Sequence, residues 1–232
     1  MSVKSKHLLD KAQKALAKKD YASAGTLFEE AVGAAPRAHQ AWFGLGEVAQ
    51  GIGQADTAAT FLARAVELQP ENPRYRQKLG EAFGRLGQAE NALEHLLIAR
   101  RLAPKDADIL CSLSGAYVKT GDWQHARAVL QDVARLPRPL AAHYCLLGLA
   151  CQQLGELDEA LTAFNKAASL APRYPDTWLS LGHLYLHKKE FDKGETCLQK
   201  LQELAPSAVT TLDLAGDLAW ARDNTIEAAS FF

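Results

Sequence analysis

The sequence predicts an all-α protein, a solenoid in which antiparallel helix pairs stack side by side. Residues 39–72 carry two runs of apolar residues at helical spacing, one starting at Trp42 and one at Ala58. Gly53 separates the two runs, and Pro70 ends the second. The same pattern returns every 34 residues along the chain, and a fixed period of this length is typical of helical repeat proteins.

Two positions of the repeat are kept small, and a third is kept large. In steps of 34, the first small position holds Ala12, Gly46, Gly80, Ser114, Gly148, Gly182 and Gly216, and the second holds Ala24, Ala58, Ala92, Ala126, Ala160, Gly194 and Ala228. The large position holds Phe28, Leu62, Leu96, Leu130, Phe164, Leu198 and Phe232. Small residues let paired helices approach closely, and we expect the large residues to fill the gap between repeats.

A proline recurs at the end of each repeat, where it stops the second helix. The column reads Pro36, Pro70, Pro104, Arg138, Pro172 and Pro206, and Pro137 and Pro139 flank the single exception. This order of columns resembles the tetratricopeptide repeat family over the whole chain. The resemblance implies a right-handed superhelix of six full repeats and part of a seventh, which we expect to form a single domain over residues 1–232. The expected repeats are 5–38, 39–72, 73–106, 107–140, 141–174, 175–208 and the partial 209–232.

Individual repeats depart from the pattern in ways that have local consequences. Lys11 replaces an apolar residue in the first repeat, as expected for a terminal repeat that no other repeat covers. We expect Pro137 to end the second helix of repeat four early, with a local kink. Lys189 takes the place of the turn glycine in repeat six. The chain ends on Phe231 and Phe232 without a polar capping helix, so we expect a longer natural chain or an end covered by another molecule.

Composition and charge exclude several classes of function. Lys and Arg number 26 against 27 Asp and Glu, a net charge of −1, which argues against nucleic-acid or anionic-membrane binding. No apolar run is long enough to span a membrane, and the first residues lack the apolar core of a secretion signal. The four cysteines, which have no metal-binding spacing, are Cys111, Cys145, Cys151 and Cys197. Unpaired thiols suit a reducing compartment, so we predict a cytoplasmic location.

The resemblance implies that the first helix of each repeat lines a concave groove in which ligands bind. In repeats four to six this groove has an apolar or soft floor, formed by Cys111, Val118, Cys145, Leu149, Leu179 and Leu186. A polar rail beside the floor consists of Arg85, Lys119, Gln153 and His187, with His183 one helical turn before the last. The floor suits an apolar segment of a partner, and the rail suits an acidic or carboxylate-bearing one. The alternatives are ordinary packing between helices for the floor and ordinary solvated surface for the rail.

These observations favour a non-enzymatic scaffold that binds a peptide or a helix of a partner protein. No paired carboxylates, nucleophile elbow or phosphate loop appears, and we predict no cofactor. His183, His187 and Asp217 only weakly suggest a metal site, because two histidines four residues apart are common by chance. The alternative is the partner-recruiting region of a larger bacterial enzyme, of the glycosyltransferase or sulfotransferase type, with its catalytic part outside this chain. Self-association through the C-terminal helix is a further possibility.

Overall fold

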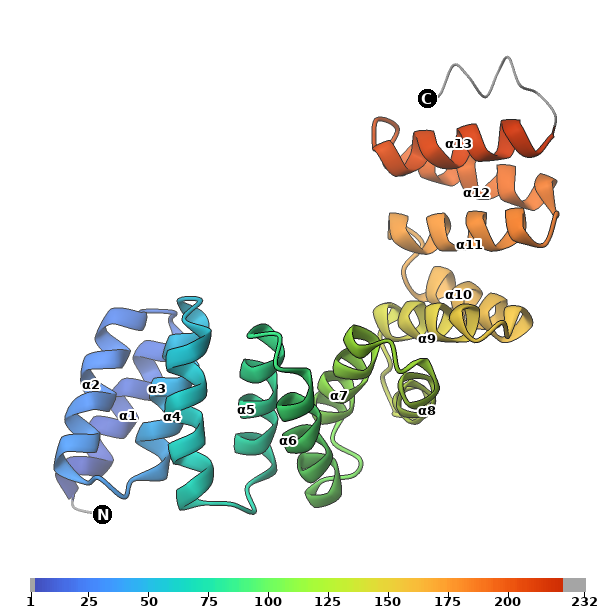
Figure 1. Cartoon of the computed structure of the whole chain (residues 1–232). Helices are drawn as coiled ribbons and strands as arrows, with labels where there is room; N and C mark the ends of the chain where they lie inside the picture. The colour runs from blue at the N-terminus through green and yellow to red at the C-terminus, as the bar shows by residue number, and fades with distance from the viewer. Residues whose placement is uncertain (1–2, 223–232) are drawn as a thin grey trace. The chain divides into compact units, whose positions relative to one another are not determined.

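The computed structural model describes residues 3–222, which form thirteen α-helices and no strand (Figure 1). The helices are α1 (Val3–Ala17), α2 (Tyr21–Ala34), α3 (His39–Gly51), α4 (Ala55–Leu68), α5 (Pro73–Arg85), α6 (Ala89–Leu102), α7 (Ala107–Thr120), α8 (Trp123–Ala134), α9 (Ala141–Gln153), α10 (Leu157–Leu170), α11 (Pro175–His187), α12 (Phe191–Leu204) and α13 (Val209–Ala221). Odd-numbered helices are the first helices of the predicted repeats and even-numbered helices the second. The prediction of an all-α helical repeat fold is confirmed.

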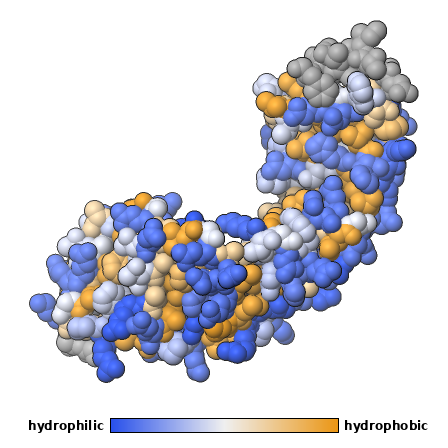
Figure 2. Space-filling view, in the orientation of Figure 1, coloured by the Kyte–Doolittle hydropathy of each residue, from blue (hydrophilic) through white to orange (hydrophobic). Residues whose placement is uncertain are grey.

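The chain divides into two compact units, Met1–Thr120 and Gly121–Phe232. In the described part of the chain, unit 1 contains α1 to α7 and unit 2 contains α8 to α13. Hydrophilic and hydrophobic residues are interspersed on the visible face of each unit (Figure 2). No helix of the described residues is both long and apolar enough to cross a bilayer. That residues 1–232 form a single domain stays a prediction.

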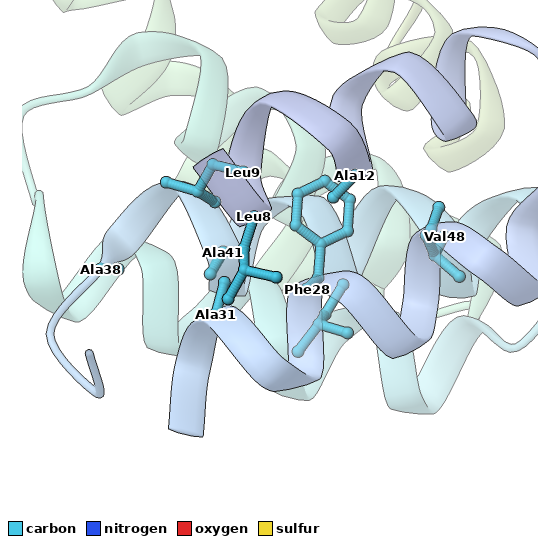
Figure 3. Packing of buried hydrophobic residues seen from close by; sticks show 10 residues of the cluster. Leu8, Leu9, Ala12, Phe28, Ala31, Ala38, Ala41 and Val48 are labelled. Atoms are coloured by element: carbon cyan, nitrogen blue, oxygen red, sulfur yellow. The ribbon is translucent and has the colours of Figure 1, made fainter. Parts of the chain in front are cut away.

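Close contact between the small and large positions holds the helix pairs of repeats one, two, three and five together. In unit 1 the ring of Phe28 on α2 lies beside Ala12 on α1 (Figure 3). The next pair repeats this arrangement, because a Cβ added at Gly46 would lie 2.5 Å from Cγ of Leu62. The same addition at Gly148 in unit 2 would lie 2.7 Å from the ring of Phe164. The small column is therefore required by helix packing, as the sequence predicts.

The second helices end just before the recurrent proline. Five of them have 14 residues, whereas α8 has 12 and ends at Ala134. The prediction that Pro137 shortens this helix is confirmed. Lys11 is exposed, as expected for the terminal repeat. Ala228, Phe231 and Phe232 lie outside the described residues.

The proline segment also receives a hydrogen bond from the next helix. The indole Nε1 of Trp42 donates to the carbonyl oxygen of Pro36, and that of Trp178 donates to Pro172, both at 2.8 Å. In repeat three Arg76 fills the tryptophan position, and its Nε donates to the carbonyl oxygen of Pro70 at 3.0 Å. Different side chains thus satisfy the same backbone acceptor where one repeat ends and the next begins.

The turn between the two helices of a repeat needs a left-handed backbone. Gly53, Gly87, Gly121 and Gly155 have φ between 73° and 80°. Lys19 and Lys189 occupy the same position in the first and sixth repeats, and both have φ of 59°. The turn geometry is therefore kept where glycine is absent, at a cost in backbone strain.

Candidate functional site

The six floor residues predicted from the sequence are all partly buried. Cys111 and Val118 lie on α7 of unit 1, and the other four lie on α9 and α11 of unit 2. Leu149 packs against the core around Phe164, and Leu179 and Leu186 pack against a second cluster, formed by Leu201, Leu214 and Leu218. These leucines therefore contribute to helix packing within unit 2, whatever else they contact.

The four rail residues are all exposed, and they divide between the two units. Arg85 and Lys119 lie on α5 and α7 of unit 1, and they line one shared hollow. Gln153 and His187 end α9 and α11 of unit 2, where His183 is half-buried. That the floor and rail bind a partner stays a prediction.

The two cysteines of the predicted floor add thiol groups to an otherwise apolar set of side chains. Sγ of Cys145 lies 3.0 Å from Oγ1 of Thr177, within hydrogen-bonding distance. Burial raises the pKa of the Cys145 thiol, and burial together with Asp108 and Asp106 raises that of Cys111. Both side chains are therefore neutral thiols at neutral pH. Among the described residues, no three or more histidine, cysteine, aspartate or glutamate side chains are placed to hold a metal ion, so His183 and His187 have no third ligand there.

A cleft of about 730 Å³ opens along the first helices of unit 1. Its lining comes from α3, α5, α7 and the residues just before α7, and consists of Glu47, Pro73, Arg74, Gln77, Lys78, Glu81, Asp106, Asp108, Cys111 and Ser112. The resemblance to the repeat family implies a groove lined by first helices, and this cleft is lined in that way.

Hydrogen bonds fix the polar floor of the cleft. Gln77, which is 6% exposed, donates from Nε2 to Oε1 of Glu81 at 2.9 Å and to Oγ of Ser112 at 3.1 Å. The hydroxyl of Ser112 also lies 2.8 Å from Oε1 of Glu81. The other carboxylate oxygen of Glu81 accepts from Nζ of Lys78 at 2.7 Å. The network ties α5 to α7 and presets the positions of these groups before any ligand arrives.

An aromatic stack supports the end of the cleft at α3. The rings of Phe43 and Tyr75 are stacked, with centroids 4.5 Å apart, and the guanidinium of Arg74 lies 5.3 Å from the Phe43 centroid. Arg74 also pairs with Glu47 at 3.0 Å. The Tyr75 hydroxyl lies 2.8 Å from Nδ1 of His39, and burial lowers the pKa of this histidine.

A smaller slot of about 200 Å³ adjoins the cleft, and the two share Glu81, Cys111 and Ser112. The slot lies between α5, α6 and α7, and its walls include Gly84, Leu96 and Gly115. Arg85 and Lys119, which are both exposed, also line the slot. The sequence therefore identified the two rail cations of unit 1, but it missed Asp106 and Asp108 because they stand at the start of α7, before the groove positions that recur in each repeat.

Comparison with known proteins supports the repeat assignment. Family models described as tetratricopeptide repeats match residues 15–82, 148–188 and 175–207, together more than half of the chain. A model described as subunit 3 of the anaphase-promoting complex matches residues 94–167. A search of curated proteins gives no match.

Solved structures give the same fold. A tetratricopeptide repeat protein from Parabacteroides merdae has a TM-score of 0.75 at 17% identity, covering 99% of this chain and 91% of that one. YrrB, described as a repeat protein with an unusual peptide-binding site, has a TM-score of 0.71 at 20% identity, covering 80% and 95%. A repeat protein from Thermus thermophilus has 28% identity and a TM-score of 0.55, covering 80% and 99%. With the 34-residue period and the helix pairs, the matching family models show that the chain belongs to the tetratricopeptide repeat family.

Proposed function

We propose that this protein is an interaction scaffold that binds a peptide or a helix of a partner protein in the groove lined by the first helices of its repeats. The observation that carries the proposal is the cleft of unit 1, where Gln77, Glu81 and Ser112 are held by one another's hydrogen bonds. Preset polar groups lower the entropic cost of binding. The peptide-binding site named for YrrB supports the proposal by likeness of fold.

Binding also involves the floor and rail of repeats four to six in this proposal. Leu149, Leu179 and Leu186 give apolar contact with the exposed part of their side chains, while Gln153 and His187 give polar contact. Burial of about 200 Å² of such a floor is worth about 5 kcal/mol before the costs of association. The alternative of a recruiting region of a larger enzyme stays a prediction, because no described residue tests it.

A pull-down from the native lysate tests the scaffold, with variants that change exposed residues only. One variant combines Arg85→Glu with Lys119→Glu in unit 1, and the other combines Gln153→Glu with His187→Glu in unit 2. Substitution of Leu149 or Leu179 is unsuitable, because both side chains pack against core clusters and their loss would disturb folding.

Circular dichroism first confirms that each variant is folded. A partner held by the wild type and lost by either variant supports the scaffold and assigns the contact to that unit. Equal recovery by all three proteins would contradict groove binding and point to the second helices instead.

A further inference from the structure

We propose that the channel between α5 and α7 selects an extended segment with a basic residue toward one end, an acidic residue toward the other and an apolar side chain between them. The channel consists of the cleft and the slot, which share Glu81, Cys111 and Ser112 as lining residues. The inference deepens the proposed scaffold function and rests on it.

The charges of the channel are sorted along its length. At the cleft, Arg74 pairs with Glu47 and Lys78 pairs with Glu81, so these four charges balance within the described lining. Asp106 and Asp108, at the start of α7, are the remaining charges there. At the slot, Arg85 and Lys119 are the remaining charges, because Glu81 is already paired. One end of the channel is therefore acidic and the other basic.

The carboxylate of Asp106 also accepts the backbone N–H groups of Asp108 and Ile109, at 3.0 and 3.1 Å. These contacts fix its position at the start of α7. Arg85 makes only a long contact, 3.5 Å from Nη1 to the carbonyl oxygen of Gln50. Its guanidinium has five N–H donors, so it keeps donors for a carboxylate. A ligand with the complementary order of charges fits both ends, and the reversed order meets like charges.

The slot has room that packing does not explain. A Cβ added at Gly115 would meet nothing within 4 Å, and one at Gly84 would meet only Cβ of Ala92, at 3.9 Å. Glycine inside a helix is less stable than alanine, and at Gly46 or Gly148 close packing accounts for it. No such contact exists at Gly84 or Gly115. With a volume of about 200 Å³, the slot is smaller than most small-molecule sites, which occupy about 300–1,000 Å³, and it suits one apolar side chain.

The geometry of α7 sets the spacing of the segment. With a rise of 1.5 Å per residue, Asp108 and Lys119 lie about 16 Å apart along the helix. An extended peptide covers about 3.3 Å per residue, so its basic and acidic residues stand about five positions apart. Gly115 is one helical turn from Lys119, about 6 Å, which places the apolar residue about two positions from the acidic one. The segment therefore has a basic residue, two residues of any type, an apolar residue, one residue of any type and an acidic residue. This order can run in either chain direction.

Selection of a phage-displayed library of random short peptides on the full chain tests this order. Selected peptides are then titrated against a variant that combines Gly84→Ala with Gly115→Ala, which narrows the slot. We expect this variant to be more stable than the wild type yet to bind the selected peptides about tenfold more weakly. Gly25→Ala is the matched control, since its Cβ would lie at an ordinary 3.7 Å from Cγ1 of Val48 on α3. It should leave binding unchanged.

A charge-exchange variant gives an independent arm. Asp108→Lys combined with Lys119→Glu keeps Asp106 and Arg85, so each end of the channel becomes neutral and the variant should lose the preference for either order of charges. Thermal melting confirms that the variant is folded at the temperature of the titration. Synthetic peptides of identical composition, RAALAE and EAALAR between glycines, serve as probes. The wild type should prefer the first, and the variant should bind both about equally; a wild type without preference would overturn the proposed order.

The outcomes distinguish failure of the channel proposal from failure of the proposed scaffold function. Enrichment of the stated order together with weaker binding by the slot variant supports the channel. Selected peptides of another order, or equal binding by the slot variant, would overturn the channel but leave the scaffold function standing. Failure to select any peptide overturns the channel too, and the lysate experiment then shows whether the scaffold function fails with it.

Discussion

Single residues that look irregular in the sequence perform the regular function of their position. Arg76 stands in a column with tryptophan and leucine, yet its Nε donates to the carbonyl oxygen of Pro70 just as Trp42 donates to that of Pro36. Lys189 stands in a column of glycine, yet it adopts the same left-handed φ as Gly155. The requirement at each position is set by the backbone, either an acceptor that needs a donor or a left-handed turn, and more than one type of side chain meets it.

The strain at Lys189 predicts a stabilising substitution. A left-handed conformation costs a residue other than glycine about 1–2 kcal/mol, and glycine's greater loss of entropy takes back about 0.5–1 kcal/mol. Lys189→Gly should therefore raise the free energy of unfolding by about 0.5–1 kcal/mol, which shifts Tm upward by about 1–4 °C in a chain of this size. Gly155→Lys, the reverse change one repeat earlier, should lower Tm by a similar amount. Differential scanning calorimetry of both variants is the check, and a lower Tm for Lys189→Gly would refute the strain argument.

Thiol reactivity is a second property of single residues. Burial raises the pKa of both Cys151 and Cys197 to about 11, and their exposed fractions are 2% and 3%. At pH 8 a thiol of pKa about 11 is ionised to only about 0.1%, so it reacts slowly even when a reagent reaches it. We expect Ellman's reagent to modify Cys111 and Cys145 first, and the two buried cysteines only in denaturant. Mass spectrometry of partly labelled protein identifies the sites, and early labelling of Cys197 would contradict the packing of unit 2.

Pairs of helices are joined by polar contacts as well as by the small and large columns. In the third repeat, Nη1 of Arg76 on α5 lies 3.1 Å from Nδ1 of His95 on α6, and Phe83 stacks on the His95 ring at 5.5 Å. Because arginine can only donate, Nδ1 must accept, and the imidazole must be neutral. Burial and the charge of Arg76 lower the pKa of His95, while Glu94 opposes them.

This contact makes the third repeat sensitive to acid. A histidine whose pKa is lowered by folding binds fewer protons in the folded state, so its contribution to stability is fully present above the unfolded pKa, about 6.5, and is lost as the pH falls below it. The urea concentration at which half of the wild-type protein is unfolded should therefore decrease as the pH is lowered from 7 to 5. The variant His95→Gln keeps a hydrogen-bond acceptor for Arg76 and does not titrate in this range. Its urea midpoint should therefore decrease less between pH 7 and pH 5. An equal loss in both proteins would assign the effect to other groups, such as His39, whose pKa is also lowered by burial.

At the scale of the whole molecule, the periodic features could be predicted from the sequence and the channel could not. A small residue at the Gly46 position and a large one at the Leu62 position recur in every repeat, so the period alone predicts the helix pairs and their approximate boundaries. The channel depends on which unlike residues come together across neighbouring repeats. Reading each column separately finds Arg85 and Lys119, but it does not show that Lys78 neutralises Glu81 and leaves those two cations unbalanced.

The floor shows a second reason for this difference. An apolar residue at a groove position can be exposed to a ligand, packed on a neighbouring helix or both. Leu149 is partly buried against the cluster around Phe164, a fact that no single position of the repeat reveals. Tests of binding are therefore cleaner at exposed polar positions, such as His187, than at the leucines that the pattern first suggests.

The indole hydrogen bonds at the start of α3 and α11 also have a spectroscopic consequence. Tryptophan emission responds to polarity and hydrogen bonding at Nε1, and Trp42 is the sole tryptophan among residues 1–120. Replacement of Trp123, Trp178 and Trp220 by phenylalanine leaves one fluorophore, which reports on unit 1 where its second repeat begins. A chain that keeps only Trp178 reports from the equivalent position in unit 2. The protein therefore carries an intrinsic fluorescent label in each unit, so ligand occupancy and unfolding can be followed separately in the two without any attached dye.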